Sequence, residues 1–167
     1  MLPHERLLAL EVRPQRIGFI VFQGTTRLLD WGVRTYGKRK SDAPSVGCAR
    51  VATLLDLYSP AVMVIRRRRT SKTPRRLINA TVARLAAEAR RRSISCRFVT
   101  VKEVRHFFAR YDRTTKHAIA SRLAEWFPDL AWKLPRKRRA WESERYNMAV
   151  FDAAATAVAY LCKIKHQ

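Results

Sequence analysis

The sequence has few cysteines and no long apolar run, and each shortage excludes a class of protein. Its three cysteines, Cys48, Cys96 and Cys162, are an odd number without a C-x-x-C pair, which supports neither a disulfide framework nor a zinc site. We expect three reduced, partly buried thiols. No stretch approaches the roughly 20 apolar residues that span a bilayer, and the N-terminus lacks a basic segment followed by an apolar signal core. We therefore expect a cytoplasmic protein without a membrane partner.

Acidic residues are also scarce. Thirteen Asp and Glu stand against 35 Lys and Arg, which gives a formal net charge of +22 and a sequence pI of about 11.3. Nucleic acid suits such a chain, because basic side chains neutralise phosphates and release counterions. We expect a nucleic-acid partner and, in the cell, association with the nucleoid. A basic surface that faces a ribonucleoprotein or anionic lipid is the alternative.

Several catalytic motifs are missing. The sequence holds neither a glycine-rich phosphate loop nor a serine-nucleophile motif. His106 and His117 lie in segments with helical character and have no second ligand at suitable spacing, while His4 and His166 are terminal. We therefore propose no histidine metal site.

The apolar pattern predicts one mixed α/β domain over residues 1–167. Hydrophobic residues make up 47% of the chain, enough for a core. Short apolar runs bounded by turn residues predict strands, and apolar residues at helical spacing predict helices. The predicted strands span residues 7–12, 16–22, 28–36, 61–65 and 96–101. The predicted helices span residues 51–58, 73–89, 101–111, 115–127 and 147–163, with a basic, proline-containing linker before the last.

The order of these elements indicates the type of sheet. The first three strands follow one another through short turns and form an antiparallel meander, while the last two alternate with helices and so join a parallel portion. Three antiparallel strands, two parallel strands and a closing helix resemble a ribonuclease H-like domain with a mixed five-stranded sheet flanked by helices. Fold order alone is an analogy and assigns no function.

Three carboxylates are candidate catalytic residues. Glu11 directly follows an apolar strand, although a solvated strand end would carry an acid equally well. Asp152 lies among small apolar residues in the last helix, where a carboxylate is costly unless it is paired or bound to a metal. Glu144 precedes Asp152 by about two helical turns, so both fall near one stripe if the helix begins early enough. A helix-start Glu favoured by the macrodipole is the alternative for Glu144.

Two short motifs carry a resemblance to a known family. The run Leu-Ala-Leu-Glu-Val-Arg-Pro at 8–14, with Gly18, resembles the opening of RuvC-like Holliday junction resolvases, and Phe-Asp-Ala-Ala at 151–154 resembles their closing motif. The resemblance implies DNA rather than RNA as the partner, a homodimer, and two Mg²⁺ or Mn²⁺ ions that activate water. It makes Glu11 and Asp152 the metal ligands, with Glu144 as a substitute third carboxylate.

The sequence departs from the family at two positions. The first-strand acid of the family is normally Asp followed by Pro-Gly, whereas here Glu11 is followed by Val12 and the proline is displaced to position 14. The family places a Glu just after the fourth strand, whereas this chain has Arg66, followed by three more arginines. A key metal ligand is therefore missing.

The arginine run suits phosphate better than metal. Four guanidiniums repel Mg²⁺ and bind phosphate bidentately, although a solvated basic loop is the alternative. The predicted nucleic-acid-binding residues are Arg66, Arg67, Arg68, Arg69, Lys72, Arg75, Arg76, Lys116, Arg136, Lys137, Arg138 and Arg139. Trp132 and Trp141 bracket the last basic run and either stack on bases or anchor the linker in the core, and the anchor role suits Trp141 better than Trp132.

These observations lead to one hypothesis and two alternatives. The leading hypothesis is a RuvC-like protein that binds structured or branched DNA, with catalysis weakened or lost. The first alternative is an active Mg²⁺-dependent endonuclease that uses Glu11, Asp152 and Glu144. The second is an RNA-binding ribonucleoprotein factor.

Overall fold

The structure, a computed structural model, describes residues 1–36, 43–67, 75–139 and 141–165. The strands are β1 (Arg6–Val12), β2 (Arg16–Gln23), β3 (Arg27–Thr35), β4 (Val62–Arg67) and β5 (Ser95–Thr100). The helices are α1 (Ala43–Tyr58), α2 (Arg75–Arg91), α3 (Val101–Ala109), α4 (Lys116–Trp126), the short 3₁₀ helix η2 (Pro128–Lys133) and α5 (Met148–Lys165).

The strands form one mixed sheet in the order β3-β2-β1-β4-β5. The pairs β1–β2 and β2–β3 are antiparallel, whereas β1–β4 and β4–β5 are parallel. This arrangement confirms the predicted three antiparallel strands followed by two parallel strands. Because β1 and β4 run side by side in the same direction, their carboxyl ends meet at one edge of the sheet.

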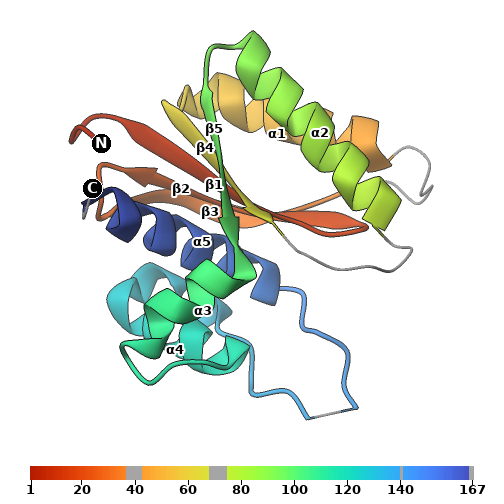
Figure 1. Ribbon diagram of the computed structural model, residues 1–167. Coiled ribbons are helices and arrows are strands. Elements are labelled where there is room, and N and C mark those ends of the chain that lie inside the picture. The colour runs from red at the N-terminus through yellow and green to blue at the C-terminus, as the bar shows by residue number, and fades with distance from the viewer. Residues whose placement is uncertain (37–42, 68–74, 140, 166–167) are drawn as a thin grey trace.

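Two helical layers cover the sheet. Helices α1 and α2 lie on one face and α5, with α3 and α4, on the other (Figure 1). Along β1, Leu7 and Ala9 belong to the core beneath α5, while Leu8 and Leu10 belong to the core beneath α1 and α2. Successive side chains of a strand point to opposite faces, so Glu11 takes the α5 face with Leu7 and Ala9.

Most predicted elements are confirmed, with small changes at their ends. Helix α1 begins at Ala43, earlier than the predicted 51, because a proline in its first turn is compatible with a helix start. The predicted linker contains η2. Thr115 caps α4 by accepting a hydrogen bond from the backbone of Ala118. The predicted cap at residues 73–74 lies outside the described residues.

Two further expectations concern the cysteines and membranes. Cys48, Cys96 and Cys162 are all free and partly buried, as predicted. Among the described residues, no helix has the length and apolar character needed to cross a bilayer.

Helix α5 packs so closely on β2 that Gly18 has no room for a side chain. A β-carbon built on Gly18 would lie 2.1 Å from the carbonyl oxygen of Ala149 and 2.3 Å from its carbonyl carbon. These are backbone atoms of α5, so no rotamer change relieves the contact. Because Gly18 pairs with Glu11, this close approach brings the first turns of α5 over the end of β1.

Gly18→Ala should therefore lower the free energy of unfolding by about 3 kcal/mol, because the helix must shift away from the sheet. Urea denaturation measures the change. The matched control is Gly47→Ala in α1, where the new β-carbon would approach the Tyr36 ring at 3.2 Å and alanine favours the helix. Equal losses in the two variants would contradict the close packing of α5 on Gly18.

Candidate functional site

Three elements bring charged side chains to one point beneath α5. On β4, Val62 and Val64 belong to the core on the α5 side, so strand alternation turns Arg66 to the same side. Glu11 reaches that side from the neighbouring end of β1. Asp152, in the second turn of α5, comes down onto both from above.

The three candidate carboxylates converge on one arginine, Arg13. Its Nη2 donates to Asp152 Oδ2 at 2.6 Å and its Nη1 donates to Glu144 Oε2 at 2.9 Å. Its Nε lies 3.6 Å from Glu11 Oε1. Arg13 is only 6% exposed, so the guanidinium stands at the centre of the carboxylates rather than at the surface.

Two more cations complete the group. Arg66 Nη1 lies 2.5 Å from Asp152 Oδ1 and its Nε lies 3.8 Å from Glu11 Oε2. Lys116, at the start of α4, donates to Glu144 and lies 3.3 Å from Asp152 Oδ2. We call this group the ion cluster; its members are Glu11, Arg13, Arg66, Lys116, Glu144 and Asp152. Three carboxylates face three cations, so the formal charges balance.

The ion cluster keeps Asp152 and Glu144 ionised. Burial alone would raise the pKa of Asp152, but the neighbouring charges of Arg66, Lys116 and Arg13 lower that pKa below the ordinary aspartate value. Burial likewise opposes the charged form of Glu144, and the hydrogen bond from Lys116 together with the charge of Arg13 lowers its pKa. Both acids therefore stay anionic at neutral pH.

The positions of the guanidiniums do not fit a bound metal. Metal ions of this kind need carboxylate oxygens that face an open position, whereas both oxygens of Asp152 contact arginine nitrogens at 2.5 and 2.6 Å. In the described part of the chain, no three His, Cys, Asp or Glu side chains are arranged to hold one ion. A divalent cation would have to displace Arg13 and Arg66 first.

The space beside the ion cluster is small. A hollow of about 20 Å³ is lined by Arg66, Lys116, Phe151 and Asp152, with side chains of α3 and the loop before α4. This volume holds about one water molecule. A nucleotide does not fit into it.

The structure corrects two predictions about the ion cluster. Arg66 does not project to the surface with the arginine run: it is 6% exposed and ion-paired with Asp152, because strand alternation turns it inward. Glu144 does not share a helical stripe with Asp152, since α5 begins at Met148. Glu144 instead reaches the cluster from the preceding segment, through Arg13 and Lys116.

The remaining predicted nucleic-acid contacts lie mostly on the surface. Lys116 is half-buried in the ion cluster. Arg68, Arg69 and Lys72 lie outside the described residues, and Arg75 opens α2. The exposed members of the predicted set, which we call the basic face, are Arg67, Arg76, Arg136, Lys137, Arg138 and Arg139.

The core-anchor interpretation of Trp141 is wrong. Trp141 is 79% exposed and Trp132 is 72% exposed. Each ring carries a nearby cation: Lys133 Nζ lies 3.9 Å from the centroid of Trp132, and the Arg139 guanidinium lies 5.7 Å from that of Trp141. Both rings are therefore exposed to solvent, and each makes a cation–π contact instead of packing into the core.

Sequence reasoning missed the role of Arg13. Its signal was the departure at the opening motif, where an arginine follows the first-strand acid by two positions. Arg13 lies one residue beyond the end of β1, where an extended chain still puts residues two apart on one face. An arginine two residues after a predicted catalytic acid is thus a sign that the acid is ion-paired.

Arg66→Met should lower the free energy of unfolding by about 3 to 5 kcal/mol, because it leaves buried carboxylates without their partner. Urea denaturation measures the loss. The double variant Arg66→Met with Asp152→Leu should lose less than the sum of the two single variants. Arg50→Met, at an exposed site on α1, is the control and should change stability by less than about 0.5 kcal/mol. An Arg66→Met loss no larger than the control would contradict the ion cluster.

Stability should fall in acid through the ion cluster. A carboxyl whose pKa is lower in the folded protein than in the unfolded chain stabilises the fold. This stabilisation is complete above the pKa of the unfolded chain, about 4, and is lost as the pH falls toward the pKa of the folded protein. The carboxyls with this behaviour here are Asp152 and Glu144. Urea midpoints at pH 7, 5, 4 and 3 should therefore decline mainly below pH 5, and the decline should be smaller in Arg66→Met. Identical declines would show that other acids carry the effect. Glu103 is one such acid, since its bonds to the Thr100 backbone and to Lys163 lower its pKa to about 2.

Comparisons with known proteins agree with this fold. No protein-family model matches the chain, and no curated protein matches its sequence. Among solved structures, it is similar to Thermus thermophilus RuvC in complex with a Holliday junction substrate, with a TM-score of 0.74 and 13% identity over 98% of this chain and 96% of that one. A second structure of T. thermophilus RuvC gives a TM-score of 0.72 and 13% identity, covering 96% of each chain. The yeast mitochondrial Holliday junction resolvase gives 0.70 and 15%, covering 99% of this chain and 82% of that one. The chain therefore has the ribonuclease H-like fold of the RuvC resolvases, as its sequence order predicts.

Proposed function

We propose that this chain binds branched or structured DNA and that its catalysis is lost, because the place of the metal ions is taken by its own cations. One observation carries the second half of the proposal: Arg13 and Arg66 stand between Glu11, Glu144 and Asp152. The RuvC-like resemblance assigns metal ligands to Glu11 and Asp152. In this chain the same two carboxylates neutralise guanidiniums.

The choice of DNA rests on charge and on the neighbours in fold. The net charge of +22 calls for a polyanion. One of the solved structures with this fold is a complex with a Holliday junction substrate, and its similarity covers nearly the whole of both chains. A homodimer belongs to the same proposal, because two copies suit the symmetry of a four-way junction.

The basic face supplies the contacts to phosphate. Its arginines are exposed, so their guanidiniums reach a phosphate backbone. Arg136 would exchange its ion pair of 2.9 Å with the partly buried Glu142 for such a contact. Trp132 and Trp141 stand beside the run at 136–139 with their rings in solvent, where unpaired bases stack on aromatic side chains. The expected binding is strong at low salt and tolerant of sequence.

The competing function is a Mg²⁺- or Mn²⁺-dependent endonuclease. It is favoured by the convergence of three carboxylates on Arg13. It requires two buried guanidiniums to move, each from an ion pair of 2.6 Å or less. RNA binding is the third possibility and calls for no junction preference.

The test is binding and cleavage of a labelled four-way DNA junction beside duplex, single-stranded DNA and single-stranded RNA, with Mg²⁺, Mn²⁺ or EDTA. We expect salt-sensitive junction binding, with two copies per junction, that is the same in all three solutions and leaves the DNA intact. Replacing Arg136 and Arg138 by Gln should weaken binding and reduce the salt slope by about 0.9 per lost phosphate contact. Arg50→Gln is the matched control on α1.

Two results would overturn the proposal. Metal-dependent cutting that disappears in Asp152→Asn would establish the endonuclease instead. Equal affinity for single-stranded RNA and the junction would favour the RNA-binding role. Because Asp152→Asn also disturbs the ion cluster, circular dichroism must first show that the variant is folded.

A further inference from the structure

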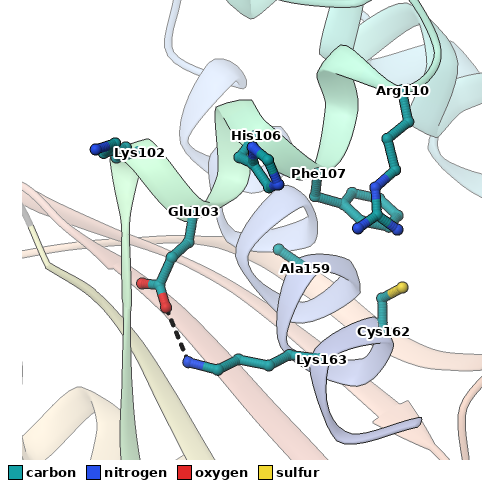
Figure 2. A pocket seen from close by; sticks show the side chains of 8 residues that line it. All are labelled: Lys102, Glu103, His106, Phe107, Arg110, Ala159, Cys162 and Lys163. Atoms are coloured by element: carbon teal, nitrogen blue, oxygen red, sulfur yellow. Dashed lines mark hydrogen bonds and ion pairs between the residues drawn. The ribbon is translucent and has the colours of Figure 1, made fainter. Parts of the chain in front are cut away.

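A second hollow lies between α3 and α5, away from the ion cluster. Its volume is about 530 Å³, within the range of about 300 to 1,000 Å³ typical of ligand sites. Figure 2 shows the side chains that line it. They are Lys102, Glu103, His106, Phe107, Arg110, Ala159, Cys162 and Lys163. We call this hollow the α3–α5 groove.

The α3–α5 groove is separate from the ion cluster. Val101, Val104 and Arg105 of α3 line the small hollow beside the ion cluster. The α3 residues that line the groove are different ones. On α5 the groove begins at Ala159, about two turns and about 10 Å along the helix axis beyond Asp152. An occupant of the groove therefore does not reach the buried carboxylates.

The floor of the groove is apolar and held in place. Phe107, Ala159 and Cys162 form it. The Phe107 ring makes contacts with the rings of Phe108 and Tyr111 at centroid distances of 5.0 and 5.7 Å. These ring contacts hold the floor in place without a ligand, so binding requires little ordering of the protein.

The rim of the groove carries an excess of positive charge. Among the described residues that line it, Glu103 is the only acid, and it is bound to Lys163 at 2.9 Å in an ion pair that bridges the two helices in Figure 2. Glu103 also accepts from the backbone of Thr100 as part of a capping box. These bonds satisfy Glu103 and Lys163, which leaves Lys102 and Arg110, both exposed, to face an anionic occupant.

We propose that the α3–α5 groove binds an acidic peptide segment of a partner protein, with one large apolar side chain of that segment on the floor. The apolar floor calls for a hydrophobic group, and Lys102 and Arg110 bind carboxylates as Lys163 already binds Glu103. A nucleic-acid strand suits the groove less, because its phosphates would have only two cations to follow, whereas the basic face offers six. The proposal does not depend on DNA binding.

Cys162 gives a direct test, since it lies on the floor while Cys48 is on α1 and Cys96 on β5. The protein is treated with iodoacetamide and the alkylation rate of each cysteine is followed by mass spectrometry. The probe is a synthetic peptide of four aspartates followed by leucine and phenylalanine. We expect it to slow alkylation of Cys162 at least about fivefold and to leave Cys48 and Cys96 unchanged. A peptide with alanine in place of phenylalanine should protect little.

Charge variants complete the test. Lys102→Gln combined with Arg110→Gln should raise the Kd for a fluorescent form of the peptide at least about tenfold, which corresponds to about 1.4 kcal/mol. The control pair Arg50→Gln with Arg90→Gln, which removes the same charge from exposed sites on α1 and α2, should leave the Kd within about twofold. Equal weakening by both pairs, or no protection of Cys162, would refute the proposal. Protection of Cys162 by a single-stranded oligonucleotide but not by the peptide would assign the groove to nucleic acid instead.

Discussion

A charged side chain that is buried away from water needs an opposite charge beside it. The helices α4 and α5 over one face of this sheet meet that need, since their charged side chains pair with each other and with those of the strands. Glu11 on β1 and Asp152 on α5 are almost fully buried between the sheet and the helix. Arg13 and Arg66 neutralise them from the ends of β1 and β4, and Lys116 adds a link from α4. The ion cluster thus ties two strands, the segment before α5 and two helices to one point. The close contact of α5 with Gly18 is what brings these elements within reach of one another.

Much of the fold could be predicted from the sequence, because its signals are local. Alternation and turn residues predict β1 to β3, and the change to strand-helix alternation predicts the parallel portion. Asp152 stood out as a carboxylate among alanines, and Glu11 as an acid at a strand end. Each of these signals lies within about ten residues of chain.

The rest of the site depends on contacts between distant parts of the chain. Arg13 and Asp152 are 139 residues apart, and only the packing of α5 on β2 brings them together. The spacing of Glu144 predicted a helical stripe, but the helix begins too late and the side chain arrives by a different path. The run of four arginines that Arg66 opens predicts a surface position for it. Strand alternation along β4 instead predicts that Arg66 points into the interior, as it does in the structure.

The equal number of cations and carboxylates in the ion cluster has a consequence for how such a chain changes over generations. Each member compensates others, so any single replacement that removes one of the buried charges leaves a partner unneutralised in the interior. A change of the ion cluster that keeps stability therefore needs a cation and a carboxylate to be replaced together, because either replacement alone leaves a buried charge unneutralised. The ion cluster thus constrains its members as a group and not one position at a time.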